Sequence, residues 1–269
     1  MSSLSWPAMP EPWATAMLQV VGWILAELPA RAVLVGGSVV RGQPDPRSDL
    51  DIQVIIHEPW GQKITRVDAG VASELFIHPL AHVADWFARD AAEGCPVGAH
   101  LLATGHPVFD PEGLYPALQA EARRWLAKGP NLDPAALERR RFAPVSDIED
   151  ALDVVARDPE QALISVAEAL PLIIDVGFLR RGLYPPRRKD RLAAVAALDA
   201  EAAGWLRSAL GQGDPVARVE AARRLCARML DATEAFAWAS PRSPIGAAMH
   251  DPCASRNLPH VPDQDAIPS

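Results

Sequence analysis

Hydrophobic and polar residues follow two different patterns along this chain, and the change between them indicates two structural regions. Up to about residue 113, short apolar runs typical of strands are interspersed with helical patterns. Beyond Gly113, strand-forming residues thin out, and alanine, leucine, arginine and glutamate dominate to about residue 240. We therefore expect an α+β fold: a mixed β-sheet with flanking helices in 1–113, a helical bundle in 114–240, and a flexible proline-rich tail in 241–269.

The first region predicts a helix, four strands and a second helix, followed by a less regular segment. The last two strands meet at Ala69-Gly70, which is a hairpin-type turn signal. Residues 98–104 fit either a short helix or a strand, and residues 106–113 fit a turn-rich connector. The helices are expected at 13–28 and 80–93, and the strands at 32–35, 52–56, 63–68 and 71–78.

The second region predicts five helices separated by glycine and proline signals. One of them is expected to break at Pro144, because proline lacks the amide hydrogen that an inner helical turn needs. The helices are expected at 114–128, 133–157, 159–182, 189–211 and 215–238.

Two carboxylates follow the glycine turn in the first region. Asp49-Leu50-Asp51 comes ten residues after Gly36-Gly37-Ser38 and leads directly into the mostly apolar run 52–56. Side chains alternate faces along a strand, so Asp49 and Asp51 point the same way. Carboxylates held this close repel each other unless a cation neutralises them, and Mg2+ prefers oxygen ligands. The spacing therefore favours a divalent metal site.

The glycine turn itself is suited to phosphate. Gly36 and Gly37 allow the backbone to approach a ligand closely, and Ser38 to Arg41 would form a helix start with free amide groups. A simpler explanation is a surface loop in which aspartates cap a turn. That explanation leaves the apolar run directly after Asp51 unexplained, so we favour the metal and phosphate site.

Several positions agree with a known family in both residue type and spacing. Gly37-Ser38 is followed by Arg41 and Gly42, and then Ser48 precedes Asp49-Leu50-Asp51. This arrangement resembles the nucleotidyltransferase superfamily, which includes DNA polymerase beta and the aminoglycoside nucleotidyltransferases. The resemblance implies a nucleotidyltransferase domain in 1–113, often with a final short strand near 106–113, and a substrate-binding helical domain in 114–240 that closes the cleft.

The resemblance also implies a third carboxylate on a neighbouring strand, and Glu74 in VASELFIH is the candidate. An outward-facing acid with no role is the alternative for Glu74. Through the same resemblance, Arg41 and Ser48 are candidates for nucleotide binding, together with Gly37 and Ser38. Arg41 could instead pair with a surface acid, and Ser48 could serve only to fix the turn before the strand. His78, on the same strand face as Glu74, would border the site.

The implied reaction moves a nucleoside monophosphate from a nucleoside triphosphate, by analogy ATP, onto a hydroxyl group and releases pyrophosphate. Asp49 and Asp51 would bind one or two Mg2+ ions, and Ser38 with the backbone after Gly37 would hold the phosphates. Glu74 would either complete the metal ligands or accept the hydroxyl proton.

Acidic and basic residues in the helical region are weaker candidates. Glu168 and Asp175 are seven residues apart on one helix and could act as a base or anchor a cationic substrate, although a solvated helix face explains them as well. Residues 180–191 hold six basic residues, including Arg187 and Lys189. Lys189 could reach the triphosphate, or the run could simply be solvated.

Charge and cysteine content narrow the choice of partners. With 26 basic and 34 acidic residues, the net charge of −8 argues against a protein that grips long nucleic acids. The three cysteines show neither a disulfide framework nor a zinc ligand set, so we expect a reducing cytoplasm. Neither a signal peptide nor a membrane span is expected. The sequence leaves the oligomeric state open.

Three functions remain in order of preference. The first is a small-molecule nucleotidyltransferase of the antibiotic-resistance type, with an aminoglycoside-like acceptor, favoured by the acidic charge and the helical second domain. The second is a nucleotidyltransferase that modifies a protein partner, as in toxin and antitoxin systems. The third is a non-catalytic nucleotide-binding module, which the intact carboxylate pair disfavours.

Overall fold

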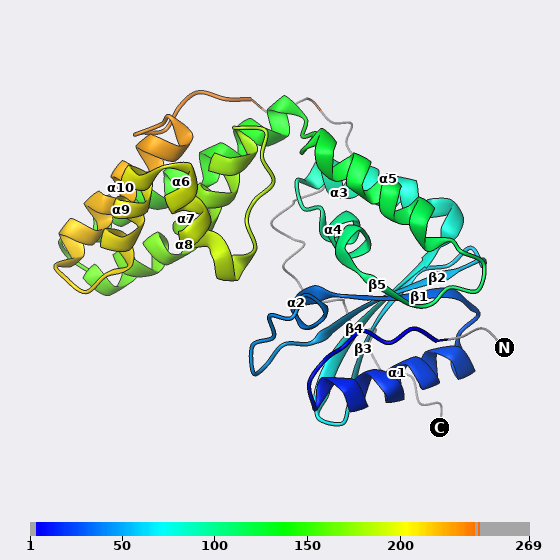
Figure 1. Cartoon of the computed structure of the whole chain (residues 1–269). Helices are drawn as coiled ribbons and strands as arrows, with labels where there is room; N and C mark the ends of the chain where they lie inside the picture. Colours follow the sequence, from blue (N-terminus) through cyan, green and yellow to red (C-terminus); the bar gives the residue numbers. More distant parts are fainter. Residues whose placement is uncertain (1–3, 240–241, 243–269) are drawn as a thin grey trace, which may run out of the picture.

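A computed structural model of the protein describes residues 4–239 and Arg242. The rest of the expected tail at 241–269 lies outside the described residues. The chain forms a lobe built on a β-sheet and a lobe built of helices, which lie side by side (Figure 1). The predicted fold class, an α+β protein with a mixed sheet, flanking helices and a C-terminal helical region, is confirmed.

Five strands form one mixed sheet in the order β3-β4-β2-β1-β5. Strands β2 and β4 are parallel, and the other neighbouring pairs are antiparallel. The central strand β2 is buried along nearly its whole length, which explains its run of isoleucine and valine. The strands are β1 (Ala30–Gly36), β2 (Leu50–Ile56), β3 (Gln62–Asp68), β4 (Val71–Pro79) and β5 (His106–Phe109).

Helices cover both faces of the sheet (Figure 1). On one face, α1 (Trp13–Glu27) packs its apolar stripe against residues such as Val33, Val54 and Leu75. The other face, which includes Leu34 and Ile55, is covered by three helices. These are α3 (Val83–Glu93), which follows the short η1 (Leu80–His82), α4 (Val97–Thr104) and α5 (Tyr115–Lys128).

The helical lobe is organised around α7, which packs against α6 and α10. Helix α7 is long and apolar enough to cross a membrane, but 56% of its most apolar stretch is buried within the protein, as in a core helix. The elements of this lobe are α6 (Pro134–Val154), α7 (Pro159–Leu179), η2 (Arg188–Asp190), α8 (Arg191–Leu198), α9 (Ala200–Leu210) and α10 (Pro215–Leu230).

The irregular segment after α3 is more ordered than its sequence pattern suggested. Residues 97–104 form a helix rather than a strand, with Leu101 and Leu102 buried. The connector at 106–113 begins with β5, the final short strand implied by the family resemblance. Strand β5 contains Pro107, which is tolerated because β5 lies at the edge of the sheet.

Three predictions for the helical lobe are wrong in detail. Helix α6 continues through Pro144 without a break, because burial of Pro144, Val145 and Ile148 offsets the missing hydrogen bond. The helix expected at 189–211 is divided at Asp199, which is extended and caps α9 with its carboxylate. The last helix ends at Leu230 because Asp231 adopts a left-handed conformation, with φ of 54°.

Helix α5 packs with the sheet lobe. Its residues Tyr115, Leu118 and Ala122 share a buried core with Ala32 and Leu34 of β1. We therefore propose that the first structural region extends to the end of α5, beyond the expected limit at residue 113.

The two lobes also touch beyond this connection. The Arg140 guanidinium of α6 donates a hydrogen bond of 2.7 Å to the Glu93 carbonyl at the end of α3. Nearby, Gly94 lies so close to Leu179 that a side chain at residue 94 would collide with it. These contacts position the end of α7 against the sheet lobe.

Candidate functional site

Three carboxylates meet at one end of the parallel strand pair. Asp49 directly precedes β2, Asp51 is the second residue of β2, and Glu74 lies opposite Asp51 on β4. One carboxylate oxygen from each lies within 4.8 Å of the others, and all three side chains are half-buried. The register of two parallel strands therefore brings together the three acids that the sequence singled out.

Asp49, Asp51 and Glu74 form an acidic triad. Their negative charges lie close together and favour the binding of a cation. The pKa of Asp51 is raised to about 6 by burial first, and then by the charges of Asp49 and Glu74. Arg41 and Lys63 oppose this shift. Lys63 also forms an ion pair of 3.0 Å with Glu74, but Lys63 is itself exposed and offers only one positive charge to three acids.

The donor set fits a hard divalent cation. All three donors are carboxylate oxygens, with no histidine or cysteine among them. Mg2+ is usually held by one or two carboxylates and completes its coordination with water and phosphate oxygens. Asp49, Asp51 and Glu74 are thus the residues that would hold Mg2+.

Gly37 is required by the geometry of the glycine turn. Its φ of +82° is in the left-handed region, and a Cβ atom at this position would overlap the Asp51 carboxylate. Helix α2 (Gly37–Val40) begins here and makes only one turn. The turn thus lies in direct contact with an acid of the triad.

Ser38 and Ser48 join the turn to the loop before β2. The Ser38 hydroxyl donates to the Ser48 hydroxyl at 2.9 Å, and Ser48 also accepts from the Asp45 amide at 2.9 Å. The Ser48 carbonyl accepts from the indole of Trp13 at 2.8 Å. Ser48 is buried, and its contacts fix the loop, while Ser38 is half-buried at the start of α2.

Basic groups from both lobes lie near the turn. The pKa of Arg41 is lowered, mainly by burial and then by the charge of Arg187, while Asp51 acts in the opposite direction. The pKa of His100 on α4 is lowered by burial and then by Arg41 and Arg187. Arg41 and Arg187 therefore form a basic group with Arg41 near Asp51, and His100 lies close to both arginines. Arg187 comes from the helical lobe, where it forms an ion pair of 2.6 Å with Asp190.

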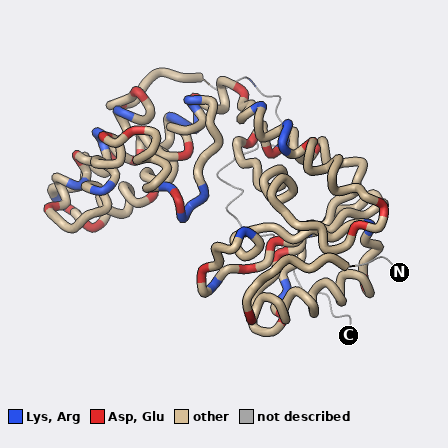
Figure 2. The backbone as a smooth tube through the Cα atoms, in the orientation of Figure 1, with Lys and Arg blue, Asp and Glu red and all other residues tan. Residues whose placement is uncertain are grey.

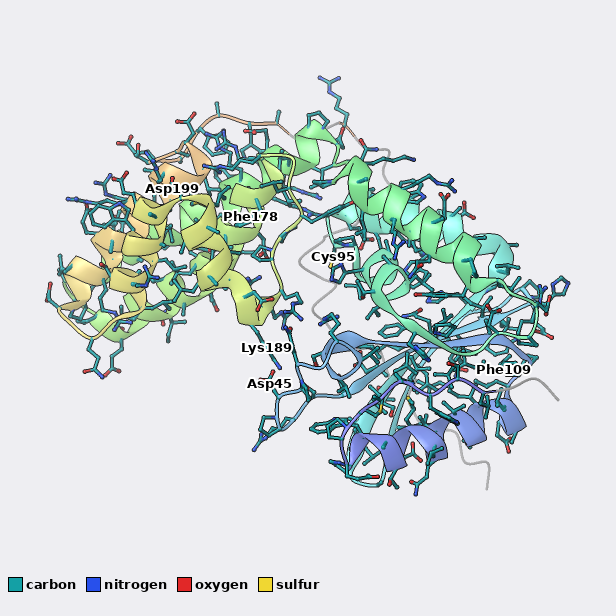
Figure 3. The ribbon with its side chains drawn as sticks, viewed as in Figure 1. Asp45, Cys95, Phe109, Phe178, Lys189 and Asp199 are labelled. Carbon is teal, nitrogen blue, oxygen red and sulfur yellow. The ribbon has the colours of Figure 1, made fainter. Side chains whose placement is uncertain are left out.

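Lys189 reaches across to the loop before β2 but contacts an acid there. Figure 3 shows Lys189 of η2 and Asp45 pointing toward each other from the two lobes, and their side chains form an ion pair. Figure 2 shows the basic residues of the segment around η2 on the side of the helical lobe that faces the sheet lobe. Lys189 thus lies near the predicted phosphate site, with Asp45 as its present partner.

The two acids predicted for the acceptor have different surroundings. Asp175 forms an ion pair of 2.6 Å with Arg191 at the start of α8. Glu168 is exposed on α7 and close enough to Asp147 on α6 to raise the pKa of Asp147, although burial contributes most to that shift. Of the two, Glu168 is the one in an acidic environment.

His78 shares a strand face with Glu74, as expected, but it packs away from the triad. Its ring stacks on Trp86 of α3, with ring centroids 3.8 Å apart, and burial lowers its pKa to about 4. Sequence reasoning gave no role to His100, Lys63 or Gln53. Of these three, only Gln53 could have been noticed from the sequence, because it is the one polar residue in the run 52–56.

Comparison with known proteins adds little beyond this geometry. No protein-family model and no curated protein matches the chain. Among solved structures, the chain is similar to a nucleotidyltransferase-like protein from Exiguobacterium sibiricum 255-15, with 13% sequence identity and a TM-score of 0.48. The similarity covers 80% of this chain and 73% of that protein. A likeness this distant supports no conclusion about function, which must rest on the site's own residues.

Proposed function

We propose that this protein is a Mg2+-dependent nucleotidyltransferase that moves AMP from ATP onto a hydroxyl group of a small molecule, such as an aminoglycoside-like antibiotic. The observation that supports this most is the acidic triad in contact with the Gly37–Ser38 turn. Carboxylates that converge beside a glycine turn suit a reaction in which a metal and a phosphate must be bound together.

In the proposed reaction, the acceptor hydroxyl oxygen forms a bond to the α-phosphorus, and the bond from that phosphorus to the β-phosphate bridge breaks. Bound Mg2+, as one or two ions, would neutralise the charge of the triphosphate and of the departing pyrophosphate. Asp49 and Asp51 would hold the metal. Glu74 would accept the hydroxyl proton, or it would be a further ligand and the proton would pass to solvent water.

The basic group gives the phosphates a second set of contacts. Arg187 lies close enough to Arg41 to lower the pKa of Arg41, and Arg41 is also close to Asp51. A triphosphate bound near them would offset their positive charge and accept hydrogen bonds from Arg41, and from Arg187 alongside or in place of Asp190. Ser38 and the Gly37 turn would hold the phosphates from the sheet lobe, and Lys189 would exchange Asp45 for a phosphate or remain on Asp45.

The acceptor would be anchored in the helical lobe. Glu168 with its neighbour Asp147 presents two acids, which suits an acceptor with amino groups. The charge of Asp175 is already matched by its ion pair with Arg191. We therefore favour Glu168 over Asp175 as the acceptor contact.

The test is incubation with Mg2+, ATP labelled at the α-phosphate, and a panel of hydroxylated antibiotics. The expected result is a labelled small molecule and stoichiometric pyrophosphate, both lost in the Asp49→Asn, Asp51→Asn double variant. Label on a protein would instead support the protein-modifying function. ATP binding without label transfer or pyrophosphate would support a non-catalytic nucleotide-binding module.

The two roles of Glu74 predict different defects in Glu74→Gln. A lost metal ligand should raise the Mg2+ concentration needed for half-maximal rate. A lost base should lower the rate at saturating Mg2+ and change its pH profile.

A further inference from the structure

Gln53 is buried beside the acidic triad without a hydrogen-bond partner. Its side chain is 1% exposed, and among the described residues neither its amide nitrogen nor its amide oxygen has a partner. Gln53 lies two residues after Asp51 on β2, with Leu34 and Phe76 beside it on the adjacent strands. An amide therefore occupies a position in the middle of the sheet where the directly paired residue on each adjacent strand is apolar.

This position is unfavourable for stability. A buried donor or acceptor without a partner destabilises the folded state, and an apolar side chain of similar size would avoid that cost. Exceptions of this kind occur where function requires them. Gln53 is too deeply buried to touch a substrate, so any function must act through a neighbouring residue.

Few polar side chains lie close enough to Gln53 to form a hydrogen bond with its amide. Residues two apart on a strand lie on the same face, about 6.6 Å apart along the strand. An extended glutamine and an aspartate together bridge that distance. Glu74 and His78 are the diagonal neighbours of Gln53 on β4. The His78 ring stacks on Trp86, but its Nε2 is also buried without a partner among the described residues, so His78 is the competing partner for the amide. Asp51 and Glu74 belong to the triad.

We propose that Gln53 is a positioning residue for the metal site, whose amide nitrogen donates a hydrogen bond to the Asp51 carboxylate when a metal is bound. The amide is a donor facing a group that, when ionised, only accepts. A hydrogen bond from behind fixes the direction in which a ligating carboxylate presents its metal-binding oxygen. This inference depends on the acidic triad being the metal site of the proposed function.

The test compares Gln53→Met with the wild-type protein in two measurements that need no substrate. Methionine keeps the length of glutamine and removes both polar atoms. We expect the dissociation constant for Mn2+, followed by electron paramagnetic resonance of the free ion, to rise about 10–100-fold. The melting temperature without metal should stay equal or rise, because an unsatisfied amide has been removed.

Ser73→Ala is the matched control. Ser73 is also fully buried on β4, and its hydroxyl also has no partner among the described residues, but it lies on the opposite face of the sheet from Glu74. Its alanine variant should bind Mn2+ with the wild-type constant. Gln53→Asn keeps an amide one methylene too short to reach Asp51, so it should weaken Mn2+ binding without introducing sulfur.

Each contrary result has a distinct meaning. Unchanged Mn2+ affinity in both Gln53 variants would overturn the role of Gln53 and leave the proposed function intact. A lower melting temperature of Gln53→Met with unchanged Mn2+ affinity would show that the amide is structural and bonds to His78 or water. Absence of Mn2+ binding by the wild-type protein would overturn the metal site itself, and the proposed function with it.

Discussion

Two features of Gly37 exclude a side chain, its backbone conformation and its closeness to Asp51, and substitutions can distinguish their effects. Its backbone is left-handed, and its missing side chain leaves room for the Asp51 carboxylate. Gly37→Ala should therefore lose about 1–2 kcal/mol of folding free energy through backbone strain. It should also displace Asp51 and weaken Mn2+ binding, as measured by calorimetric titration.

Gly70→Ala is the control for backbone strain alone. Gly70 has a similar φ of +78°, with nothing within 4 Å of a Cβ atom. Its alanine variant should lose comparable stability in urea unfolding and bind Mn2+ normally. Equal Mn2+ affinities in the two variants would show that contact between Gly37 and Asp51 is unimportant.

Asp90 should make stability depend on pH. Burial raises its pKa from 3.8 to about 6, although its carboxylate accepts a hydrogen bond from the Gly98 amide at 2.9 Å. Between these values the folded protein holds a proton that the unfolded chain has lost, so stability should fall as pH rises through this window. An asparagine side chain cannot titrate, so Asp90→Asn should gain stability relative to the wild type from about pH 4 to about pH 6. Urea unfolding at several pH values checks this, and a difference that does not vary with pH would refute it.

At the scale of elements, three helices begin with the same pair of residues. Asp133-Pro134, Asp158-Pro159 and Asp214-Pro215 start α6, α7 and α10, and each aspartate accepts a hydrogen bond from an amide in the first turn. The aspartate satisfies a free amide, and proline tolerates the first helical position. The starts predicted from glycine and proline signals, at 133, 159 and 215, lie within a residue of the observed ones.

Asp214→Ala should cost about 1 kcal/mol, because the capping bond to the Ala217 amide, 3.0 Å long, is lost. Asp214→Asn retains an acceptor and should lose much less. The measurement is the denaturant midpoint of each variant. A loss as large in the asparagine variant as in the alanine variant would assign the effect to charge instead of the hydrogen bond.

Elements that depend on long-range packing were harder to predict. The strands carry their own signal, because the runs at 52–56 and 71–78 are apolar or alternating, and they appear in β2 and β4. Helix α6 continues through Pro144 only because α7 packs against it, and β5 exists only because β1 pairs with it. β1 is far from β5 in sequence, and the packing of α7 on α6 is a tertiary contact, so a local pattern reveals neither.

The same distinction applies to the candidate site. Asp49, Asp51 and the glycine turn are close in sequence, and their spacing predicted their proximity. The family resemblance implied a third carboxylate on a neighbouring strand, and Glu74 joins the two aspartates because β2 and β4 pair in parallel. The basic run 180–191 indicated that Arg187 could approach the site, whereas the position of His100 depends on how α4 packs, and the sequence held no local signal for it.

At the scale of the whole molecule, an ion pair between Lys189 and Asp45 links the two lobes beside the site. Both side chains are largely exposed, so the pair contributes at most about 1 kcal/mol. If it holds the lobes in register, Lys189→Asp and Asp45→Lys should each raise the KM for ATP, by up to about fivefold. The charge-swapped double variant should restore it.

If Lys189 instead binds phosphate, the variants should show a different pattern of KM values. Lys189→Asp would then raise KM while Asp45→Ala would not, and the swapped variant would stay impaired. High salt should reduce the effect of the ion pair in the wild-type protein, since exposed charges are screened.

The central claim is that Asp49, Asp51 and Glu74 together hold a divalent cation. The most direct measurement is anomalous X-ray diffraction from crystals soaked in Mn2+, which takes the same hard oxygen ligands as Mg2+. We predict an anomalous peak within coordination distance of all three carboxylates in the wild-type protein and its absence in Asp51→Asn. A wild-type crystal with Mn2+ bound elsewhere and no peak at the triad would contradict the account.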